Sequence, residues 1–417
     1  MTYLRLLRTM WRCSPTSARG RRLVEFTAKA VLLPVARASR RWHSEIVNIG
    51  VTGSSGKTTT KNLIHAVLAT RWPGVASQGS RNRGRMLLRA MLRHQSGLRY
   101  RILELGAFGP GTLDELLYAF RPDIAVITNI GMEHYATFRS LDAIAQEKCK
   151  LVERLTSQGL AVLNADDARV SALRTLAPSR TILAGEHPDA DLRAEEVRSA
   201  WPDPLSFVAR GRESGVEIVT QLYGAQWVFP VLAAIAVGRA LGVPMEEIAT
   251  ALAACRSEPG RMSRLRTDNG ADWICDDWKA PVWSYPSALA FLEHAHARRK
   301  ILILGQFSDS PLKPRRLYAR LARQGREVAD QVCLVGRHAR HGLRARTDDG
   351  DTSIQAFASP RQAAQFLSGF LRRGDLVLVK ATAPRRIRLS TQIVGASRLP
   401  PPSTNAGQIG DTHAMRS

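Results

Sequence analysis

The hydrophobic pattern of the chain is clearest over residues 46–68. Apolar residues alternate there as in a buried strand, at Ile46, Val47, Ile49 and Val51. They then recur at the spacing of one helical face, at Leu63, Ile64, Val67 and Leu68. The segment GSSGKT separates the two patterns. The pattern therefore predicts a strand, a glycine turn and a helix in succession, which is the setting of a phosphate-binding loop.

The turn carries the residue types that bind phosphate. Glycines let backbone N–H groups close around a phosphate, the helix N-terminus adds partial positive charge, and Lys57 adds a full one. Val51 stands where the GxxxxGK[ST] pattern has its first glycine, so the pattern is the shorter GxxGKTT. A glycine turn with a solvated lysine is the alternative. The predicted phosphate-binding residues are Gly53, Ser54, Ser55, Gly56, Lys57, Thr58 and Thr59.

Strands and helices continue to alternate after this loop. Strands are predicted at residues 101–106, 123–129 and 159–163, and helices at residues 113–120 and 141–155. This rhythm is typical of a parallel sheet with binding sites at the carboxyl ends of its strands. Polar residues follow those ends, namely Glu104, Asn129, His134, Asn164, Asp166 and Asp167. Each alone would be an ordinary solvated side chain, but together they predict a metal-nucleotide site.

Residues 191–226 read as short strand-like pieces, helices follow at 231–241 and 245–255, and RSEPGR at 256–261 interrupts the pattern. A second α/β rhythm begins beyond it, with strands predicted at residues 273–276, 300–304, 331–335 and 376–379 and helices at 287–296, 315–323 and 360–371. We therefore predict an α/β fold with a central phosphate-loop domain over residues 46–256, built on a mostly parallel sheet. A smaller Rossmann-like domain is predicted over residues 257–396. Residues 397–417 contain three consecutive prolines and are predicted to be disordered.

Residues 1–45 are predicted to form a basic helical arm. Within the first twelve residues, apolar side chains fall on one helical face and arginines on the other. Such a helix lies on a membrane surface or packs against the protein itself, and an organelle-targeting peptide is the third interpretation. The apolar run at residues 23–35 is shorter than the ~20 residues that span a bilayer and is interrupted by charges, so no transmembrane helix is predicted.

The composition limits the function further. A chain of 417 residues suggests two or three domains. Its five cysteines are widely spaced and fit neither a disulfide framework nor a zinc site. This favours a location in the cytoplasm. If the arm binds lipid, the protein would lie at the inner face of the membrane. The net charge of +24 is spread along the chain without a nucleic-acid recognition motif. We therefore expect anionic small molecules as partners and no nucleic acid.

Four further motifs follow the phosphate loop in order: ELGA at 104–107, TNIGMEH at 128–134, AQEKCK at 145–150 and NADD at 164–167. With these motifs the chain resembles the Mur ligases, ATP-dependent enzymes that join a carboxylate to an amine. The resemblance extends from residue 46 to about residue 394 and includes PGR at 259–261, Asp276 with Asp277, KILILG at 300–305 and GDLVLVK at 374–380. It is closest to the branch that adds D-alanyl-D-alanine to the peptidoglycan precursor.

The resemblance implies a role for individual residues. Lys57 and the loop N–H groups would hold the β- and γ-phosphates of ATP, Asn164 would face the adenine, and Arg261 would reach the phosphates from the hinge. Asp277, or in second place Asp276, would contact the nucleotide from the second domain. Mg²⁺ would be bound by Thr58, Glu104, His134 and a carbamylated Lys148, with Lys150 as the alternative to Lys148. The catalytic residues would be Lys57, His134 and Lys148.

Other features depart from this branch. Only about 45 basic, helical residues precede the first strand, so we expect the uridine-nucleotide-binding domain of most Mur ligases to be absent. DDWKAP at 276–281 is short and lacks the asparagines of the branch, and GAQWVFP at 224–230 lacks its His and Asn. Gln306 and Phe307 replace an acid and a methionine. We therefore expect retained nucleotide chemistry and altered recognition of the amino-acid substrates.

The sequence supports three functional hypotheses. The first is an ATP-dependent amide ligase that works through an acyl phosphate on a small-molecule carboxylate and amine without a uridine nucleotide, in cell-envelope, capsule or specialised peptide biosynthesis. The second is the D-alanyl-D-alanine-adding ligase itself. The third is a nucleotide-binding regulatory protein that has lost ligation. The presence of Glu104, His134 and Lys148 together favours an enzyme over a protein that only binds nucleotide. The sequence leaves the oligomeric state open.

Overall fold

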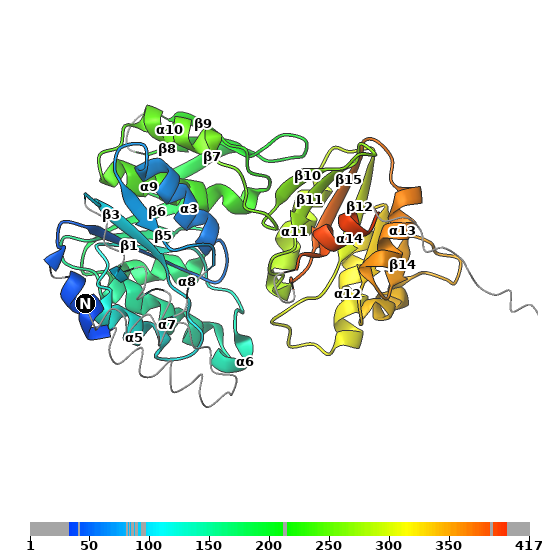
Figure 1. Cartoon of the computed structure of the whole chain (residues 1–417), viewed down its shortest axis with the longest axis horizontal. Coiled ribbons are helices and arrows are strands. Elements are labelled where there is room, and N and C mark those ends of the chain that lie inside the picture. The colour runs from blue at the N-terminus through cyan, green and yellow to red at the C-terminus, as the bar shows by residue number, and fades with distance from the viewer. Residues whose placement is uncertain are drawn as a thin grey trace, which may run out of the picture.

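The computed structural model describes residues 33–40, 42–80, 82, 84, 87, 91–92, 97–211, 215–383 and 387–397. These residues form two β-sheets that lie side by side, each covered by helices (Figure 1). The first sheet takes its strands from residues 47–219 and the second from residues 263–380. The predicted α/β fold is confirmed.

The first sheet has nine strands in the order β2-β3-β1-β4-β5-β6-β7-β8-β9. Neighbours are parallel as far as β7, and β8 and β9 are antiparallel. The strands are β1 (Val47–Thr52), β2 (Gly74–Ala76), β3 (Tyr100–Glu104), β4 (Ile124–Ile127), β5 (Leu160–Asn164), β6 (Arg180–Gly185), β7 (Leu192–Arg198), β8 (Ser206–Arg210) and β9 (Val216–Val219).

The position of β1 between β3 and β4 brings the site together. Val51 pairs with Glu104 of β3, and Thr52 pairs with Ile127 of β4. The phosphate loop, Glu104 and the segment that follows β4 therefore leave the sheet side by side, at the edge where parallel α/β sheets bind ligands.

Helices cover both faces of the first sheet. Apolar side chains of α3 (Lys57–Leu68), α9 (Val228–Ala240) and α10 (Met245–Ala254) pack on one face, and those of α5 (Thr112–Ala119) and α7 (Leu141–Glu153) pack on the other. Gly238 lets α9 approach α3 closely, because a Cβ atom there would lie 2.7 Å from Val67. The short helices are α6 (Tyr135–Phe138), α8 (Ala168–Ser171), η1 (Ala172–Leu176) and η2 (Ala225–Trp227).

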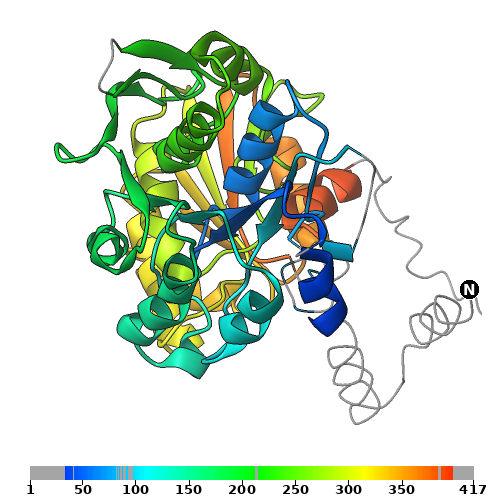
Figure 2. The same ribbon diagram turned by 90° about the vertical axis from the view of Figure 1, so that its left-hand side faces the viewer.

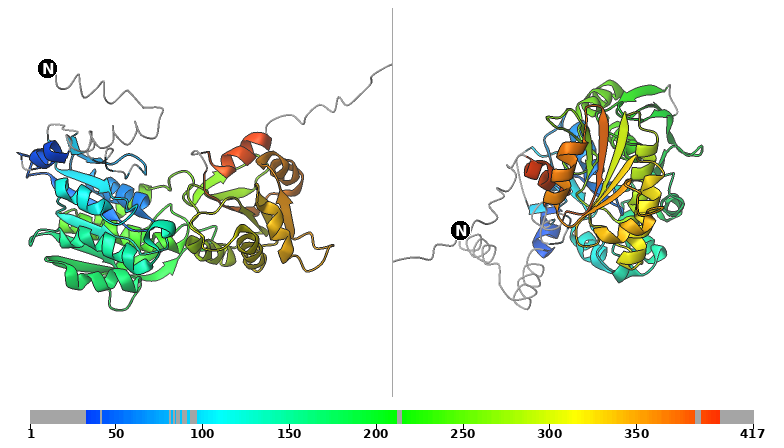
Figure 3. Two further views of the ribbon diagram at one scale, coloured as in Figure 1. Left: turned by 90° about the horizontal axis from the view of Figure 1, so that it is seen from below. Right: turned by 90° about the vertical axis from the view of Figure 1, so that its right-hand side faces the viewer.

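The second sheet has six strands in the order β10-β11-β15-β12-β13-β14, and only the edge strand β10 is antiparallel to its neighbour. The strands are β10 (Ser263–Arg266), β11 (Asp272–Asp276), β12 (Arg299–Leu304), β13 (Gln331–Val335), β14 (Ile354–Phe357) and β15 (Asp375–Lys380). Figures 2 and 3 show its helices on both faces. They are η3 (Val282–Ser284), α11 (Tyr285–Glu293), α12 (Pro314–Arg326), η4 (Ala339–Ala345), α13 (Pro360–Phe370) and α14 (Leu389–Ser397).

The structure adds elements to the predicted pattern. The predicted strands and helices are present with ends shifted by up to a few residues, and the loose region 191–226 contains β7, β8 and β9. Strands β2, β6, β10 and β14 were not predicted, because they are short or mix apolar and charged residues. The domain boundary at residues 256 and 257 stays a prediction.

The predicted N-terminal arm lies partly, and the predicted C-terminal tail almost wholly, outside the described residues. Residues 1–32 of the basic arm and residues 398–417 of the tail lie outside the described residues, whereas residues 33–40 form a helix. In the described ranges, every helix is too short or too polar to cross a bilayer.

Candidate active site

The phosphate loop joins β1 to α3 through two glycines with left-handed backbone angles. The φ angles of Gly53 and Gly56 are 142° and 75°. A Cβ atom at Gly53 would lie 1.8 Å from the hydroxyl oxygen of Thr128, so the loop passes too close to β4 for any larger residue. α3 begins at Lys57 without a side-chain cap, which leaves its first-turn N–H groups, including that of Thr59, available to an anion.

Asn129 fixes the shape of the loop from the end of β4. Its carboxamide oxygen accepts hydrogen bonds from the N–H groups of Ser54 and Ser55, at 3.1 and 2.8 Å. Its amide nitrogen donates to the Ser55 hydroxyl at 2.7 Å. The polar residue that the sequence placed at this strand end therefore supports the loop from outside and holds its backbone in a curved conformation.

Three lysines converge on the carboxylate of Glu133. The Nζ atoms of Lys57, Lys148 and Lys279 lie 3.1, 3.7 and 2.7 Å from its oxygens. Lys57 and Lys148 also donate to the carbonyl oxygen of Gly53, at 2.5 and 2.9 Å. The cluster therefore has more positive than negative charge and lies directly against the phosphate loop, an arrangement that attracts an anion.

Burial and the lysines together set the charge states in this cluster. Burial alone would raise the pKa of Glu133, but Lys57, Lys148 and Lys279 lower the pKa far below its usual range. Burial lowers the pKa of Lys148 to about 7, although Glu133 opposes the change. Burial also lowers the pKa of His134, whose ring lies 3.8 Å from Glu133. Glu133 is therefore ionised, and Lys148 holds its proton weakly.

Glu104 is the second carboxylate beside the loop. Its side chain is buried at the end of β3 and accepts hydrogen bonds from the Thr58 hydroxyl at 2.7 Å and from Asn82 at 2.9 Å. No basic side chain among the described residues forms an ion pair with it. The described His, Cys, Asp and Glu residues also form no cluster of three that could hold a metal. A cation here would therefore need phosphate or water oxygens as additional ligands.

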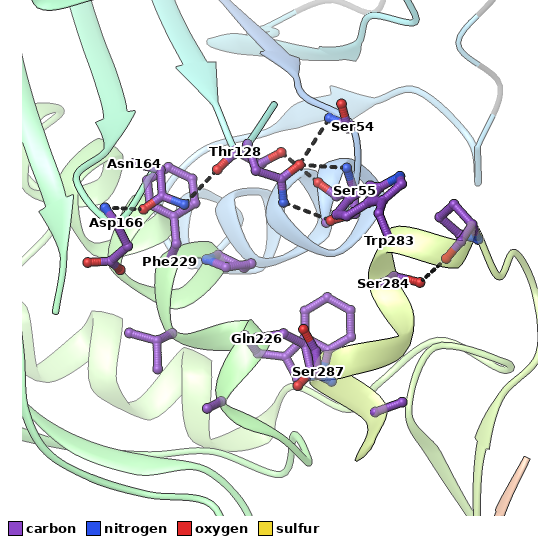
Figure 4. A pocket seen from close by; sticks show the side chains of 18 of the residues that line it. Ser54, Ser55, Thr128, Asn164, Asp166, Gln226, Phe229, Trp283, Ser284 and Ser287 are labelled. Carbon is purple, nitrogen blue, oxygen red and sulfur yellow. Dashed lines mark hydrogen bonds between the residues drawn. The ribbon is translucent and has the colours of Figure 1, made fainter. Parts of the chain in front are cut away.

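A cavity of about 270 Å³ lies beside the loop and takes its walls from both sheets (Figure 4). Asn164, Gln226 and Phe229 line it from the first domain. Trp283 and Ser287 line it from the second. Asn164 is held in place, because its amide nitrogen donates to Thr128 at 2.8 Å and its oxygen accepts from the Asp166 N–H group at 3.0 Å.

The second domain also contacts the segment that carries Glu133. The indole ring of Trp283 packs on Gly131, where a Cβ atom would lie 2.7 Å from the ring. The carboxylate of Asp309 accepts a hydrogen bond from the His134 N–H group at 3.1 Å. Lys279 adds its ion pair to these contacts, so the second domain closes one side of the lysine cluster.

Two family descriptions match this chain. Residues 51–238 match the Mur ligase middle domain, and residues 260–383 match the family described as "Mur ligase, glutamate ligase domain". The chain belongs to the Mur ligase family. It is therefore an ATP-dependent, ADP-forming ligase by class, and the resemblance seen in the sequence is confirmed.

Several relatives of this chain share one name within the Mur ligases. The chain is 29% identical to the UDP-N-acetylmuramoyl-tripeptide–D-alanyl-D-alanine ligase of Mycobacterium leprae, over 85% of this chain and 75% of the relative. It is 30% identical to the enzyme of the same name from Mycobacterium bovis, over 85% and 74%. The crystal structure of MurF from Acinetobacter baumannii has the same fold, with a TM-score of 0.79, 24% identity and coverage of 89% and 81%. MurF from Thermotoga maritima in complex with ADP has a TM-score of 0.76, 22% identity and coverage of 88% and 83%.

The two lysines of the Mur ligase motif AQEKCK point in different directions. Lys148 is fully buried and reaches Gly53 and Glu133. Lys150 instead pairs with Asp114 at 2.6 Å and Glu147 at 2.7 Å, on the outside of α7. Lys148 is thus the lysine that lies beside the phosphate loop.

Arg261 and the acidic strand end lie at the junction of the domains. Arg261 donates to the Ser80 hydroxyl at 2.6 Å, so it spans from the second domain to the first. Asp276 lines the cavity and pairs with Lys380.

The structure gives Asp277 a different surrounding. Its carboxylate is fully buried, and one oxygen accepts a hydrogen bond from the Ser390 N–H group at 2.7 Å. Burial raises the pKa of Asp277. Successive residues at a strand end point to opposite sides, and Asp276 is the one that lines the cavity. The preference for Asp277 over Asp276 as the nucleotide contact stays a prediction.

Sequence reasoning missed Glu133 and Lys279. Both lie inside quoted motifs, TNIGMEH and DDWKAP, but neither was given a role. Their ion pair joins the two domains, and the two residues lie 146 positions apart in the chain. The signal in the sequence was the acid directly before His134 and the lysine in DDWKAP, the short segment that lacks the asparagines of the branch.

Proposed function

We propose that this Mur ligase joins the carboxylate of a peptide to the amino group of a dipeptide of the D-alanyl-D-alanine type. The names of its relatives, which it matches over about three quarters of their length, support this substrate pair. The observation that carries the chemistry is the convergence of Lys57, Lys148 and Lys279 beside the phosphate loop. Such concentrated positive charge suits a phosphoryl group in transfer.

The reaction would proceed in two steps. An oxygen of the substrate carboxylate attacks the γ-phosphorus of ATP, the bond to the bridging oxygen breaks, and ADP leaves with the electron pair. The amine nitrogen then attacks the carbonyl carbon of the acyl phosphate, inorganic phosphate leaves, and the nitrogen loses a proton to give the amide. Lys57 would counter the charge on the γ-phosphoryl oxygens in the first step.

The second domain would protect the intermediate. Water hydrolyses an acyl phosphate, so the site must be closed before the first step. Lys279 and Trp283 contact the segment 131–133 of the first domain and would close the site on that side.

The side chains fit a magnesium ion. Glu104 is a buried carboxylate without an ion pair in the described part of the chain, and the Thr58 hydroxyl lies 2.7 Å from it. Mg²⁺ prefers such oxygen ligands and completes its shell with phosphate and water. We propose Thr58, Glu104, His134 and a carbamylated Lys148 as the residues that hold Mg²⁺, which would neutralise phosphate charge when bound.

Carbamylation of Lys148 is a separate part of this proposal. A buried, weakly protonated amine can attack the carbon of carbon dioxide and lose a proton, which gives a carbamate. The product would replace a buried cation by an anion that Lys57 and Lys279 can stabilise, since both are already within reach of Glu133. The resemblance to the Mur ligases supports the modification.

A second candidate is a ligase for a carboxylate without a uridine nucleotide. Gln226 and Trp227 line the cavity where the branch has its His and Asn, and the segment DDWKAP, which carries Lys279, is short and lacks the asparagines of the branch. These substitutions change side chains near the substrates, which favours a different carboxylate or amine.

A ligation assay with the full chain separates the two candidates. ATP, Mg²⁺ and D-alanyl-D-alanine are supplied with the uridine-linked tripeptide precursor, or with peptides that have a free carboxylate and no nucleotide. Amide product is measured by mass spectrometry and ADP by a coupled assay. A kcat/KM above ~10⁴ M⁻¹s⁻¹ on the uridine-linked substrate supports the first candidate. Product only with the free peptides supports the second, and no ADP release with any pair of substrates rejects both.

Cytoplasmic location and membrane contact of the N-terminal arm stay predictions. Residues 1–32 lie outside the described residues. The oligomeric state also stays open.

A further inference from the structure

A second basic site lies away from the cavity. The helix at residues 33–40, the end of α5 and the turn between α7 and β5 enclose a cleft of about 680 Å³. Four arginines line it, namely Arg37, Arg40, Arg121 and Arg154. In Figure 1 this helix is drawn in dark blue at the left edge, at the end of the first domain that is farther from the second domain.

Most of the positive charge of this cleft is uncompensated. Arg40 pairs with Asp123 at 2.8 Å. Arg37, Arg121 and Arg154 are exposed, and none of them forms an ion pair with a described carboxylate. Glu153 is the only acidic residue among the described residues that line the cleft. Three exposed arginines therefore face one carboxylate, and the cleft is complementary to anionic groups.

Exposed apolar side chains gather at the same place. The exposed fractions are 78% for Trp42 and 54% for Tyr118. Arg37 lies over the ring of Tyr118, 4.5 Å from its centre. Only seven large hydrophobic side chains in the described ranges are exposed in this way. Tyr118 lines the cleft, and Trp42 lies between Arg40 and Ser44 in the chain, which both line it. Exposed aromatic rings next to arginines are characteristic of surfaces at the membrane interface.

We propose that this face, made by Arg37, Trp42, Tyr118, Arg121 and Arg154, docks the enzyme onto an anionic phospholipid surface. The arginines would contact headgroup phosphates, and the rings of Trp42 and Tyr118 would lie at the level of the headgroups. A small soluble anion would satisfy the arginines but would leave these apolar side chains in water. The nucleotide cavity and the second domain lie elsewhere on the molecule, so a docked enzyme remains accessible to its substrates.

Vesicle sedimentation with the full chain tests this proposal. The vesicles contain phosphatidylcholine alone or phosphatidylcholine with phosphatidylglycerol. The variant with Arg37→Glu, Arg121→Glu and Arg154→Glu is compared with a control that has Arg315→Glu, Arg316→Glu and Arg320→Glu, three exposed arginines of α12. Both variants change the net charge equally. ATP turnover and thermal unfolding of both should match those of the wild type, since neither set lies in the nucleotide site.

The expected result is selective loss of binding in the first variant. Each arginine near an anionic surface contributes about a fivefold factor, so binding to phosphatidylglycerol vesicles should fall by at least about a hundredfold. The control should bind within about threefold of the wild type. Binding should also weaken at high salt, because surface charges are screened.

Three results overturn the proposal. One is equal loss in both variants, which would indicate attraction by net charge alone. The second is unchanged binding of the first variant, and the third is no binding by the wild type. A second measurement is independent of charge: Trp42→Phe should remove a blue shift in tryptophan fluorescence that phosphatidylglycerol vesicles cause in the wild type. If added RNA binds at the cleft and vesicles do not bind, the cleft is a nucleic-acid site instead.

Discussion

Glu133 and Lys279 lie 2.7 Å apart, although one follows β4 of the first sheet and the other follows β11 of the second. Their surroundings differ. The side chain of Glu133 is 9% exposed and contacts two further lysines, whereas that of Lys279 is 36% exposed. Removing the carboxylate should therefore affect the folded core of the site, and removing the ammonium should affect mainly the contact between domains.

Glu133→Gln should lower the free energy of unfolding by about 3 kcal/mol. The substitution keeps the shape but leaves the buried ammonium groups of Lys57 and Lys148 without their counter-charge, and breaking a buried ion pair from one side is costly. Urea unfolding of the purified variant measures the change. A loss below about 1 kcal/mol would mean that water or another group compensates the lysines.

Lys279→Ala should change stability by less than about 1 kcal/mol, because its side chain is partly exposed. We expect a larger effect on catalysis, a fall in turnover of roughly tenfold or more, since the variant loses one cation from the phosphoryl site and one contact that closes the domains. Steady-state ADP release measures it. Lys300→Ala, a lysine of β12 that donates to the Glu293 carbonyl oxygen, is the control and should keep normal turnover. Normal turnover of Lys279→Ala as well would exclude Lys279 from the reaction.

Lys57→Ala should abolish ATP turnover while the protein stays folded. A charge that clamps phosphate in a closed site contributes on the order of 3 kcal/mol to transition-state stabilisation, which corresponds to a hundredfold or more in rate. ADP release and circular dichroism are measured on the same preparation. A folded variant with more than about half the normal rate would show that the loop is not a catalytic phosphate site.

Lys148→Ala should lose activity and regain part of it when a small carboxylate is added, because the added anion replaces the proposed carbamate. Lys150→Ala is the matched control, since Lys150 lies two residues away and pairs with Asp114 and Glu147 on the outside of α7. It should keep normal activity. Loss of activity in Lys150→Ala with rescue by the carboxylate would exchange the roles of the two lysines.

The sequence predicted those parts of the site that depend on neighbours along the chain. Lys57 and Thr58 follow from the glycine turn, and the positions of Glu104 and Asn129 follow from the rule that parallel strands bring their carboxyl ends together. The contact of Glu133 with Lys279 could not be predicted, because it depends on how two separate sheets pack. The sequence also could not show which of Asp276 and Asp277 lines the cavity, because the strand period distinguishes two faces but not which face meets the cavity.

The two aspartates at the end of β11 should behave differently. Asp276→Ala should raise KM for ATP by roughly tenfold, the effect of losing one charged hydrogen bond, and should also lower stability, because the buried Lys380 ammonium loses its partner. Asp277→Ala should lower the free energy of unfolding by about 1–3 kcal/mol, because the buried N–H group of Ser390 loses its acceptor. Nucleotide kinetics and urea unfolding of both variants test this. A raised KM in Asp277→Ala and a normal KM in Asp276→Ala would identify Asp277 as the nucleotide contact.

The buried amine of Lys148 should also make stability depend on pH. Its pKa falls from 10.5 to about 7 on folding, because burial disfavours the charged form. Between these values the unfolded chain holds a proton on this lysine and the folded chain does not, so stability rises as pH increases from about 7 toward 10.5. Lys148→Met removes the group, and groups that titrate in both proteins cancel in the comparison. The free energy of unfolding of the wild type minus that of the variant should therefore rise over this range, in carbonate-free and magnesium-free buffer. A flat difference would mean that the folded protein keeps the Lys148 ammonium charged, with Glu133 compensating its burial in full.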